Sequence, residues 1–130
     1  MTAPTARHTR DASDDRLEHV CQTAIDGRRA VRKLAQWAER FQLSESELQI
    51  IWSLCGVIGP GIDQTTLAAQ LALSPPQVSA CVEKLRARGL IVICEARGDR
   101  RRRLWQSSAR GSSVMQEIVQ AAGASREAAA

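Results

Sequence analysis

Apolar residues recur at helical spacing along most of the chain, which predicts a mainly α-helical protein. The longest run extends from about Ser13 to Phe41 and repeats every seven residues, as in a helix that packs against other helices. The two rows of this seam are Leu17, Ala24, Val31 and Ala38, and Val20, Gly27, Leu34 and Phe41. Such a helix can pack within its own domain or form a dimer interface, and its length favours the interface.

A second helix is predicted to begin after Ser44. Ser44 and Glu47 have capping-box spacing, and Leu43 can pack against Leu48 across the start of the helix. The apolar face of this helix is predicted to continue through Ile51, Trp52 and Cys55. The sequence GVIGPG at residues 56–61 then predicts a loop.

Two further helices are separated by only a few residues. Asp63 can cap a short helix over residues 64–71, and Ser74 can cap a longer helix that stops at Gly89. Gln77 stands three residues after Ser74, where it can close a capping box. The buried face of the longer helix is predicted to consist of Val78, Cys81, Val82 and Leu85. This pair of helices is typical of a helix-turn-helix, with the second helix as the recognition helix.

A β-hairpin is predicted to follow the recognition helix. The β-branched run at residues 90–94 predicts one strand, and residues 104–106 can return as the second. The turn between them, from Glu95 to Arg103, carries Arg97, Arg100, Arg101, Arg102 and Arg103. A solvated basic loop and a DNA contact are the two interpretations, and the helix-turn-helix directly upstream favours DNA.

The chain ends in one more predicted helix, which Ser108 can cap. Its apolar stripe is predicted to be Val114, Met115, Ile118, Val119 and Ala122. In chain order, the elements predict a mainly α fold with a small β-hairpin wing. This is a winged helix-turn-helix flanked by dimerisation helices.

Charge is distributed unevenly along the chain. With 130 residues and 44% hydrophobic content, the chain can bury the core of one domain, and its formal net charge is +4. Residues 74–110 hold nine basic and three acidic residues, a balance of +6, whereas the rest holds nine basic and eleven acidic residues, a balance of −2. The positive part is therefore expected to face a polyanion.

Other function classes find little support in the sequence. The four cysteines are far apart and the histidines are His8 and His19, so neither a metal site nor a disulfide framework is predicted. We find no nucleophile–base pair and no phosphate-binding glycine loop, so an enzyme is the least favoured class and no cofactor is expected. No apolar segment is long enough to span a membrane, and a cytoplasmic location is expected.

Three segments carry a family resemblance. They are LAAQLALS at residues 67–74, VSACVEKLRARGL at residues 78–90 and GDRRRRLWQSSARG at residues 98–111. Their order and spacing resemble the MarR family of bacterial transcriptional regulators, over roughly Leu43 to Val119. Asp99, Arg100 and Arg101 stand where the family has its wing Asp-Arg-Arg, while Ser108 and Gly111 stand where a Thr and a Gly open the next helix.

The resemblance implies roles for particular residues. Asp99 would hold the wing through a nearby arginine, and Arg101 would enter the minor groove. Ala80 departs from the family, whose recognition helices often carry a basic residue there. The family usually ends in two helices, but this chain has room for about one, so its dimer would depend more on the first long helix.

We therefore expect a homodimeric, sequence-specific DNA-binding transcriptional regulator that acts as a repressor and is found on the bacterial nucleoid when bound. The alternative is a winged helix that serves as a protein-interaction module with weak, non-specific DNA binding. The predicted organisation is a disordered tail (residues 1–12), a dimerisation helix (13–42), a DNA-binding domain (43–107) and a C-terminal helix that contributes to the dimer (108–130). The predicted DNA-binding residues are Ser74, Gln77, Ser79, Ala80, Lys84, Arg97, Arg100, Arg101, Arg102 and Arg103. The predicted dimer residues are Leu17, Val20, Ala24, Val31, Leu34 and Ile118.

Two regulatory features are also considered. The resemblance implies a crevice for a small-molecule effector between the dimerisation helices and the DNA-binding lobe, which Trp37 or Trp52 could line, although a core role for each is favoured. Cys21 is the candidate redox residue, because some oxidant-sensing relatives carry a reactive cysteine in this region. The acidic neighbours Glu18 and Asp26 disfavour its thiolate, so inert thiols are the favoured interpretation.

Overall fold

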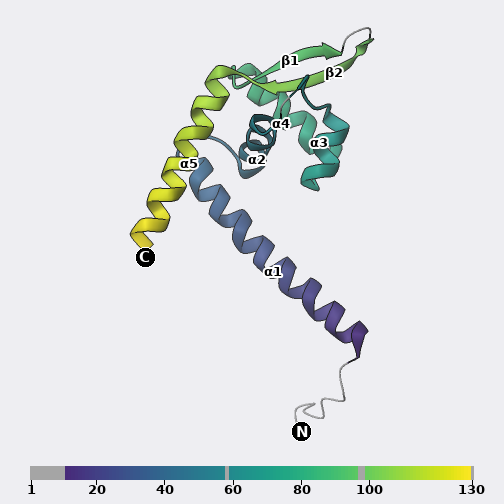
Figure 1. Cartoon of the computed structure of the whole chain (residues 1–130), viewed down its shortest axis with the longest axis vertical. Helices are drawn as coiled ribbons and strands as arrows, with labels where there is room; N and C mark the ends of the chain where they lie inside the picture. The colour runs from purple at the N-terminus through teal and green to yellow at the C-terminus, as the bar shows by residue number, and fades with distance from the viewer. Residues whose placement is uncertain (1–10, 58, 97–98, 130) are drawn as a thin grey trace. The chain divides into compact units, whose positions relative to one another are not determined.

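Five helices and a two-stranded antiparallel hairpin form the described part of the chain, in the order α1, α2, α3, α4, β1, β2, α5 (Figure 1). The computed structural model describes residues 11–57, 59–96 and 99–129, and it describes no side chains in residues 95–102 and 125–129. The fold class predicted from the sequence is confirmed. The chain divides into two units, Met1–Lys33 and Leu34–Ala130.

The described part of the first unit is a single helix. Helix α1 (Ala12–Glu39) begins in this unit, and its side chains up to Lys33 are exposed except for the half-buried Asp14. The predicted dimer residues Leu17, Val20 and Val31 are 64%, 56% and 40% exposed. Most of the predicted disordered tail, residues 1–10, lies outside the described residues.

The second unit contains one aliphatic core. Helices α2 (Glu45–Cys55), α3 (Gln64–Leu71), α4 (Pro75–Ala87) and α5 (Ala109–Ala129) bury it together with the hairpin and the last turn of α1. The fully buried larger side chains are Trp105, Ile50, Ile51, Leu67, Leu85, Leu90, Ile91, Val78 and Val82. Helix α1 ends at Glu39, two residues before the predicted Phe41, and Gln42 just beyond adopts a positive φ of 58°.

Helices α2 and α3 begin where the sequence predicts. Ser44 Oγ accepts the Glu47 amide at 3.1 Å, and Glu47 Oε1 accepts the Ser44 amide at 2.7 Å, which completes the capping box. Asp63 Oδ1 accepts the Thr66 amide at 2.7 Å and caps α3. These ends are encoded locally, by residues three positions apart.

The caps of α4 and α5 agree with the prediction except in one side chain. Ser74 Oγ accepts the Gln77 amide at 3.3 Å, and Gly89 beyond the other end of α4 has a φ of 73°. Ser108 Oγ accepts the Gly111 amide at 3.0 Å at the start of α5. The predicted capping box at Ser74 is half formed, because the Gln77 side-chain amide instead donates to Ser46 Oγ at 3.4 Å.

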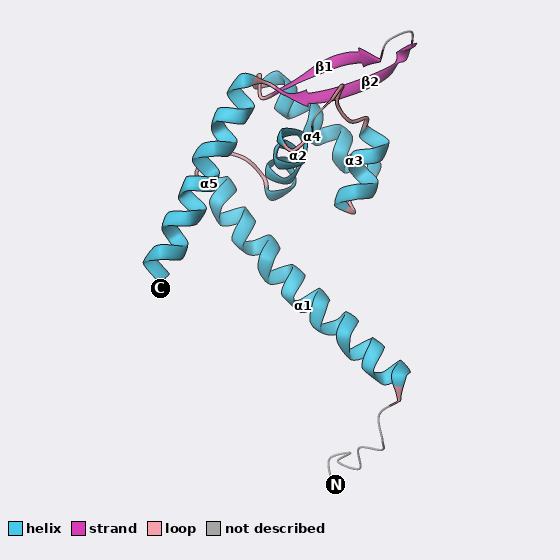
Figure 2. Ribbon diagram, viewed as in Figure 1, coloured by secondary structure: helices cyan, strands magenta, loops and turns pink. Residues whose placement is uncertain are grey.

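Strands β1 (Ile91–Ala96) and β2 (Asp99–Ser107) are longer than predicted (Figure 2). The antiparallel register pairs Ile91 with Ser107, and the ladder continues past a bulge between Glu95 and Ala96. The prediction of a turn from Glu95 to Arg103 was wrong. Charged side chains leave the backbone N–H and C=O groups available for pairing, and most of the arginine run lies in β2, which pairs with β1. Only residues 97–98 separate the two strands in the sequence.

A third segment pairs with the hairpin, and the sequence did not reveal it. Ile62 and Trp105 exchange backbone hydrogen bonds of 3.0 and 2.8 Å, which attaches the loop before α3 to β2. Gly61 has a φ of 112°, and a Cβ there would collide with the Trp105 carbonyl oxygen. Glycine at this position therefore lets the loop approach the strand.

Some predicted core positions are exposed. Trp52 and Val119 are each 61% exposed, and Cys55 is also exposed. The buried face of α2 is formed instead by Glu47, Leu48, Ile50, Ile51 and Leu54 with Ser46. Trp52 lies one residue further around the helix than Ile51, and Cys55 is the last helical residue, where fewer neighbours cover it.

Candidate nucleic-acid interface

Helix α4 has one buried face and one exposed face. The predicted inner residues Val78, Cys81, Val82 and Leu85 are all buried. The outer face carries Pro76, Ser79, Ala80, Glu83 and Lys84, all of which are exposed. Small and polar side chains on an exposed helix allow close approach to another surface, including the base edges of a DNA groove.

Two of the predicted DNA-binding residues also have structural partners. Ser74 caps α4, and the Gln77 side chain reaches Ser46, which is buried on α2. Both residues remain exposed. Further along the helix than Ser74 and Gln77, the side chains of Ser79, Ala80 and Lys84 also project from the exposed face.

Arg88, which is not among the predicted site residues, fixes the other end of α4. Its Nη1 donates to the Gln42 carbonyl at 2.7 Å, and its Nη2 donates to the Phe41 carbonyl at 2.9 Å. The planar guanidinium thus spans two consecutive carbonyls just after α1. This contact joins residues 46 and 47 positions apart, so no local pattern could have indicated it.

The wing supplies one described basic side chain. Arg103 on β2 is exposed. Arg97 lies outside the described residues, as do the side chains of Asp99, Arg100, Arg101 and Arg102. The predicted groove contact of Arg101 and the wing-shaping role of Asp99 and Arg101 therefore stay predictions.

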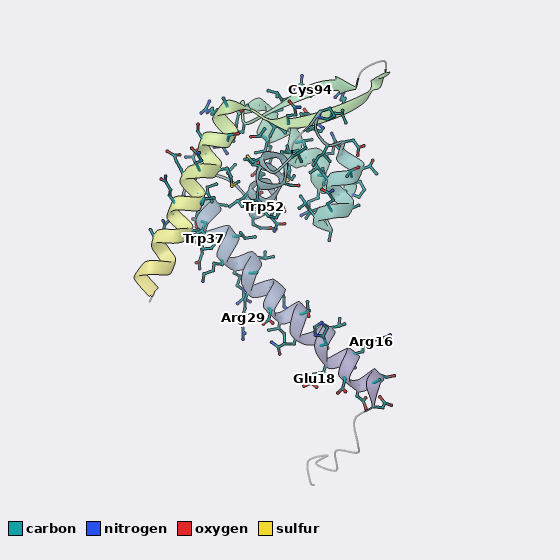
Figure 3. All side chains as sticks on the ribbon, viewed as in Figure 1. Arg16, Glu18, Arg29, Trp37, Trp52 and Cys94 are labelled. Carbon is teal, nitrogen blue, oxygen red and sulfur yellow. The ribbon has the colours of Figure 1, made fainter. Side chains whose placement is uncertain are left out.

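An apolar hollow of about 300 Å³ lies within the second unit. It is lined by Leu34, Trp37, Leu48, Gln49, Trp52, Met115, Ile118, Val119 and Ala122. Figure 3 labels its two tryptophans, Trp37 near the end of α1 and the exposed Trp52 on α2. The favoured core role for Trp52 was therefore wrong, and both tryptophans line a surface that can accept an apolar group.

The four cysteines have different environments. Cys21 and Cys55 are exposed, and Cys55 Sγ donates to Ser107 Oγ at 3.3 Å. Cys81 is buried in α4, and burial, aided by the Glu47 carboxylate, raises the pKa of its thiol above its ordinary value. Cys94 is half-buried and donates to Gln106 Oε1 at 3.1 Å. The prediction that Cys55 lies on an apolar face was wrong.

Thiol labelling should separate these environments. With iodoacetamide at pH 8 we expect Cys21 and Cys55 to react within minutes, and Cys81 to react only when the protein unfolds, because it is buried and its thiol stays protonated. Mass spectrometry of the labelled peptides measures the labelling rate of each cysteine with and without urea. Rapid labelling of Cys81 in the native protein would contradict its burial.

The sequence matches the MarR family over residues 41–102. This segment begins just after α1 and runs through the helix-turn-helix into β2. Over this segment, which is just under half of the chain, the winged helix is similar to the MarR family. The matching segment includes the exposed face of α4 and Asp99–Arg102, and it ends one residue before Arg103.

Solved structures share the fold at low sequence identity. The transcriptional regulator BldR from Sulfolobus solfataricus superposes with a TM-score of 0.75 at 20% identity, over 85% of this chain and 78% of that one. A mutant of MepR from S. aureus bound to an oligodeoxyribonucleotide gives 0.69 at 16% identity, over 85% and 80%. CouR from Rhodococcus jostii RHA1 bound to p-coumaroyl-CoA gives 0.67 at 21% identity, over 86% and 76%. No curated protein sequence gives a significant match.

MarR-family proteins are winged-helix transcription regulators and not enzymes. Among the described residues, no group of histidine, cysteine and acidic side chains is arranged to hold a metal ion. In the same part of the chain, no helix is long and apolar enough to cross a membrane.

Proposed function

We propose that this chain is a homodimeric transcriptional repressor that places α4 in the major groove and its wing in the minor groove of DNA. The observation that supports this most strongly is the two-sided character of α4. Its inner face is fixed in the core by four buried residues, while its outer face is exposed and free of large apolar side chains. The surrounding segment, residues 74–110, carries a charge of +6.

The residues divide into base-reading and phosphate-binding roles in this proposal. Gln77 and Ser79 can form hydrogen bonds with base edges, because a side-chain amide and a hydroxyl both donate and accept. Lys84 and Arg103 can neutralise phosphates, together with the remaining arginines of the wing. Ala80 is small enough for van der Waals contact with a thymine methyl group.

The proposed assembly assigns residues 13–42 and 108–130 to the dimer and residues 43–107 to DNA. The exposed apolar row of α1 supports a role in pairing. Ile118 is buried in the core of its own chain, so Val119 offers the more accessible apolar surface on α5. A symmetric dimer would present its two α4 helices to major grooves about 34 Å apart.

Selection of bound DNA from a random library tests this function. A repressor of this kind should enrich a palindromic site whose half-sites are about one helical turn apart. Binding without sequence preference would instead favour the protein-interaction module. A reporter gene placed behind the selected site would then be expressed less when the protein is present.

Replacing Arg103 with alanine should weaken binding to all DNA sequences and reduce the salt slope. If Arg103 meets one phosphate, the slope of log K against log salt should become shallower by about one unit. Fluorescence anisotropy over a range of salt concentrations measures it. Arg40→Ala makes the same charge change at an exposed residue outside the basic segment, so it should leave the slope unchanged. Equal slopes for both variants would exclude a phosphate contact by Arg103.

We also propose the apolar hollow as the site of a small-molecule effector. Its lining offers two indole rings and no charged side chain, which suits an apolar or aromatic ligand. CouR, which shares this fold, was solved with p-coumaroyl-CoA bound. A ligand seated there should quench tryptophan fluorescence in the wild type, and it should quench less in Trp52→Ala, where Trp37 is the indole that remains in the lining. Equal quenching in both proteins would place the ligand elsewhere.

A further inference from the structure

We infer that residues 12–33 of α1 pair antiparallel with the same helix of a second copy, so that Asp14 lies beside Arg28 of the other chain. The inference rests on the proposed homodimer and specifies how its α1 helices meet. Three properties of the helix support it: an uncovered apolar seam, a reversal of charge along the helix, and the alternation of large and small residues in the seam.

Among the described residues of its own unit, nothing covers the apolar seam of α1. Leu17, Val20 and Val31 are exposed, and they occupy the two rows of the seven-residue repeat. An exposed row of this kind on a helix of 28 residues is unfavourable in water unless another surface covers it. A second helix with the same repeat is the natural cover, because each seam residue then fits between residues of the other helix.

Charge reverses sign along the same helix. Residues 11–26 contain five acidic residues and one arginine, a balance of −4, whereas residues 27–33 contain four basic residues and no acidic one, a balance of +4. Figure 3 shows Arg16, Glu18 and Arg29 projecting from α1. A parallel pair would place like charges together, whereas an antiparallel pair places each acidic half beside a basic half.

The helix dipole accounts for only part of this pattern. Asp14 and Asp15 lie in the first turn, where negative charge stabilises a helix. The basic residues at 28–33 lie in the interior of the helix, and its last turn contains no basic residue. Asp26 and Arg29 form a local pair at 3.9 Å, but Arg28 is two residues from Asp26 and so points to another side of the helix, and Arg32 and Lys33 lie about two turns after Asp26.

The seam residues themselves select a register. When Leu17 is placed opposite Gly27 of the other copy, Val20 falls opposite Ala24, so each large side chain meets a small one. A Cβ on Gly27 would meet no atom within 4 Å in its own chain, which leaves room for the incoming Leu17. In the parallel arrangement Gly27 would face Gly27 and Ala24 would face Ala24, and the seam would contain gaps.

The same register brings opposite charges together beside the seam. Asp14 and Arg28 occupy equivalent flanking positions two heptads apart, about 21 Å along one helix, so they cannot pair within one chain. Antiparallel pairing places Asp14 of each chain next to Arg28 of the other chain, so the dimer contains two such pairs. Cys21 occupies the flanking position halfway between them and meets Cys21 of the second copy at the two-fold axis.

A charge-reversal series tests the direction of pairing. Arg28→Asp should raise the dimer dissociation constant by roughly tenfold, because two Asp14–Arg28 pairs change from attraction to repulsion. The double variant Asp14→Arg with Arg28→Asp should recover most of the wild-type affinity. Arg29→Asp makes the same charge change on the face away from the seam and serves as the control. Analytical ultracentrifugation measures the constants, and circular dichroism checks that every variant keeps its helix content.

Salt and crosslinking provide further measurements. The effect of Arg28→Asp should shrink in 1 M salt, where the screening length is about 3 Å. A short bismaleimide should join two chains through Cys21, with the product lost in Cys21→Ser and retained in Cys55→Ser. Crosslinking that persists in Cys21→Ser would contradict the register.

The outcomes separate the inference from the function on which it rests. A wild-type monomer at micromolar concentration would overturn both the homodimer and this pairing. A wild-type dimer that becomes tighter in Arg28→Asp would show parallel helices. A wild-type dimer that responds equally to Arg28→Asp and Arg29→Asp would show that α1 pairs in another way, and either result would leave the homodimer intact.

Discussion

Replacing Gly111 with alanine is expected to lower the free energy of unfolding by about 3 kcal/mol or more. Gly111 is buried in the first turn of α5, and a Cβ there would overlap the Leu90 carbonyl oxygen and lie 2.9 Å from Ser107 Oγ. The Leu90 oxygen cannot easily retreat, because it accepts the Ser108 amide at 3.1 Å. Urea unfolding followed by circular dichroism measures the loss.

The same helix supplies a matched control for this prediction. Gly123 is exposed, and a Cβ there would meet no atom within 4 Å. Gly123→Ala should therefore raise the free energy of unfolding by about 0.5–1 kcal/mol, which is the usual gain for alanine over glycine inside a helix. Similar changes in both variants would mean that the start of α5 does not approach Leu90 so closely.

Features that depend on neighbouring residues could be predicted from the sequence. The cap residues Ser44, Asp63, Ser74 and Ser108 each bond an amide three positions further on, so their spacing alone locates the helix starts. The inner face of α4 followed from helical spacing in the same way. Together with the order of the elements, these local signals were enough to predict the winged helix.

Features that depend on distant residues could not be predicted. The apolar character of Trp52 suggested a core role, but what covers a residue depends on elements far along the chain, and this face of α2 borders the hollow. Gln77 has the capping-box spacing, yet its side chain bonds Ser46, 31 positions away, instead of the start of its own helix. The pairing of Ile62 with Trp105 likewise gave no signal in either segment alone.

The candidate interface was predictable in outline, for a physical reason. Exposed recognition residues such as Ser79 and Lys84 are identified by elimination, because helical spacing assigns the inner face and leaves the outer one. How the rest of the fold holds that face in position depends on contacts between residues that are far apart in the sequence. Arg88 provides the clearest example, since it bonds to carbonyls just after a different helix.

Arg88→Ala is expected to lower the free energy of unfolding by about 2 kcal/mol. The substitution removes two charge-assisted hydrogen bonds and leaves the carbonyls of Phe41 and Gln42 without their donor. Arg88→Lys should recover only part of the loss, because one ammonium cannot reproduce the planar fork that spans both carbonyls. Chemical unfolding of the three proteins gives the ranking.

Arg86→Ala is the matched control, because Arg86 is exposed, lies two residues earlier in α4 and carries the same charge. It should change stability by less than about 0.5 kcal/mol. If the Arg88 contact also holds α4 in position, Arg88→Ala should weaken sequence-specific DNA binding more than it weakens binding to random DNA at a temperature where the variant is fully folded. Equal destabilisation by the two variants would show that charge, and not the two carbonyl bonds, is the source of the effect.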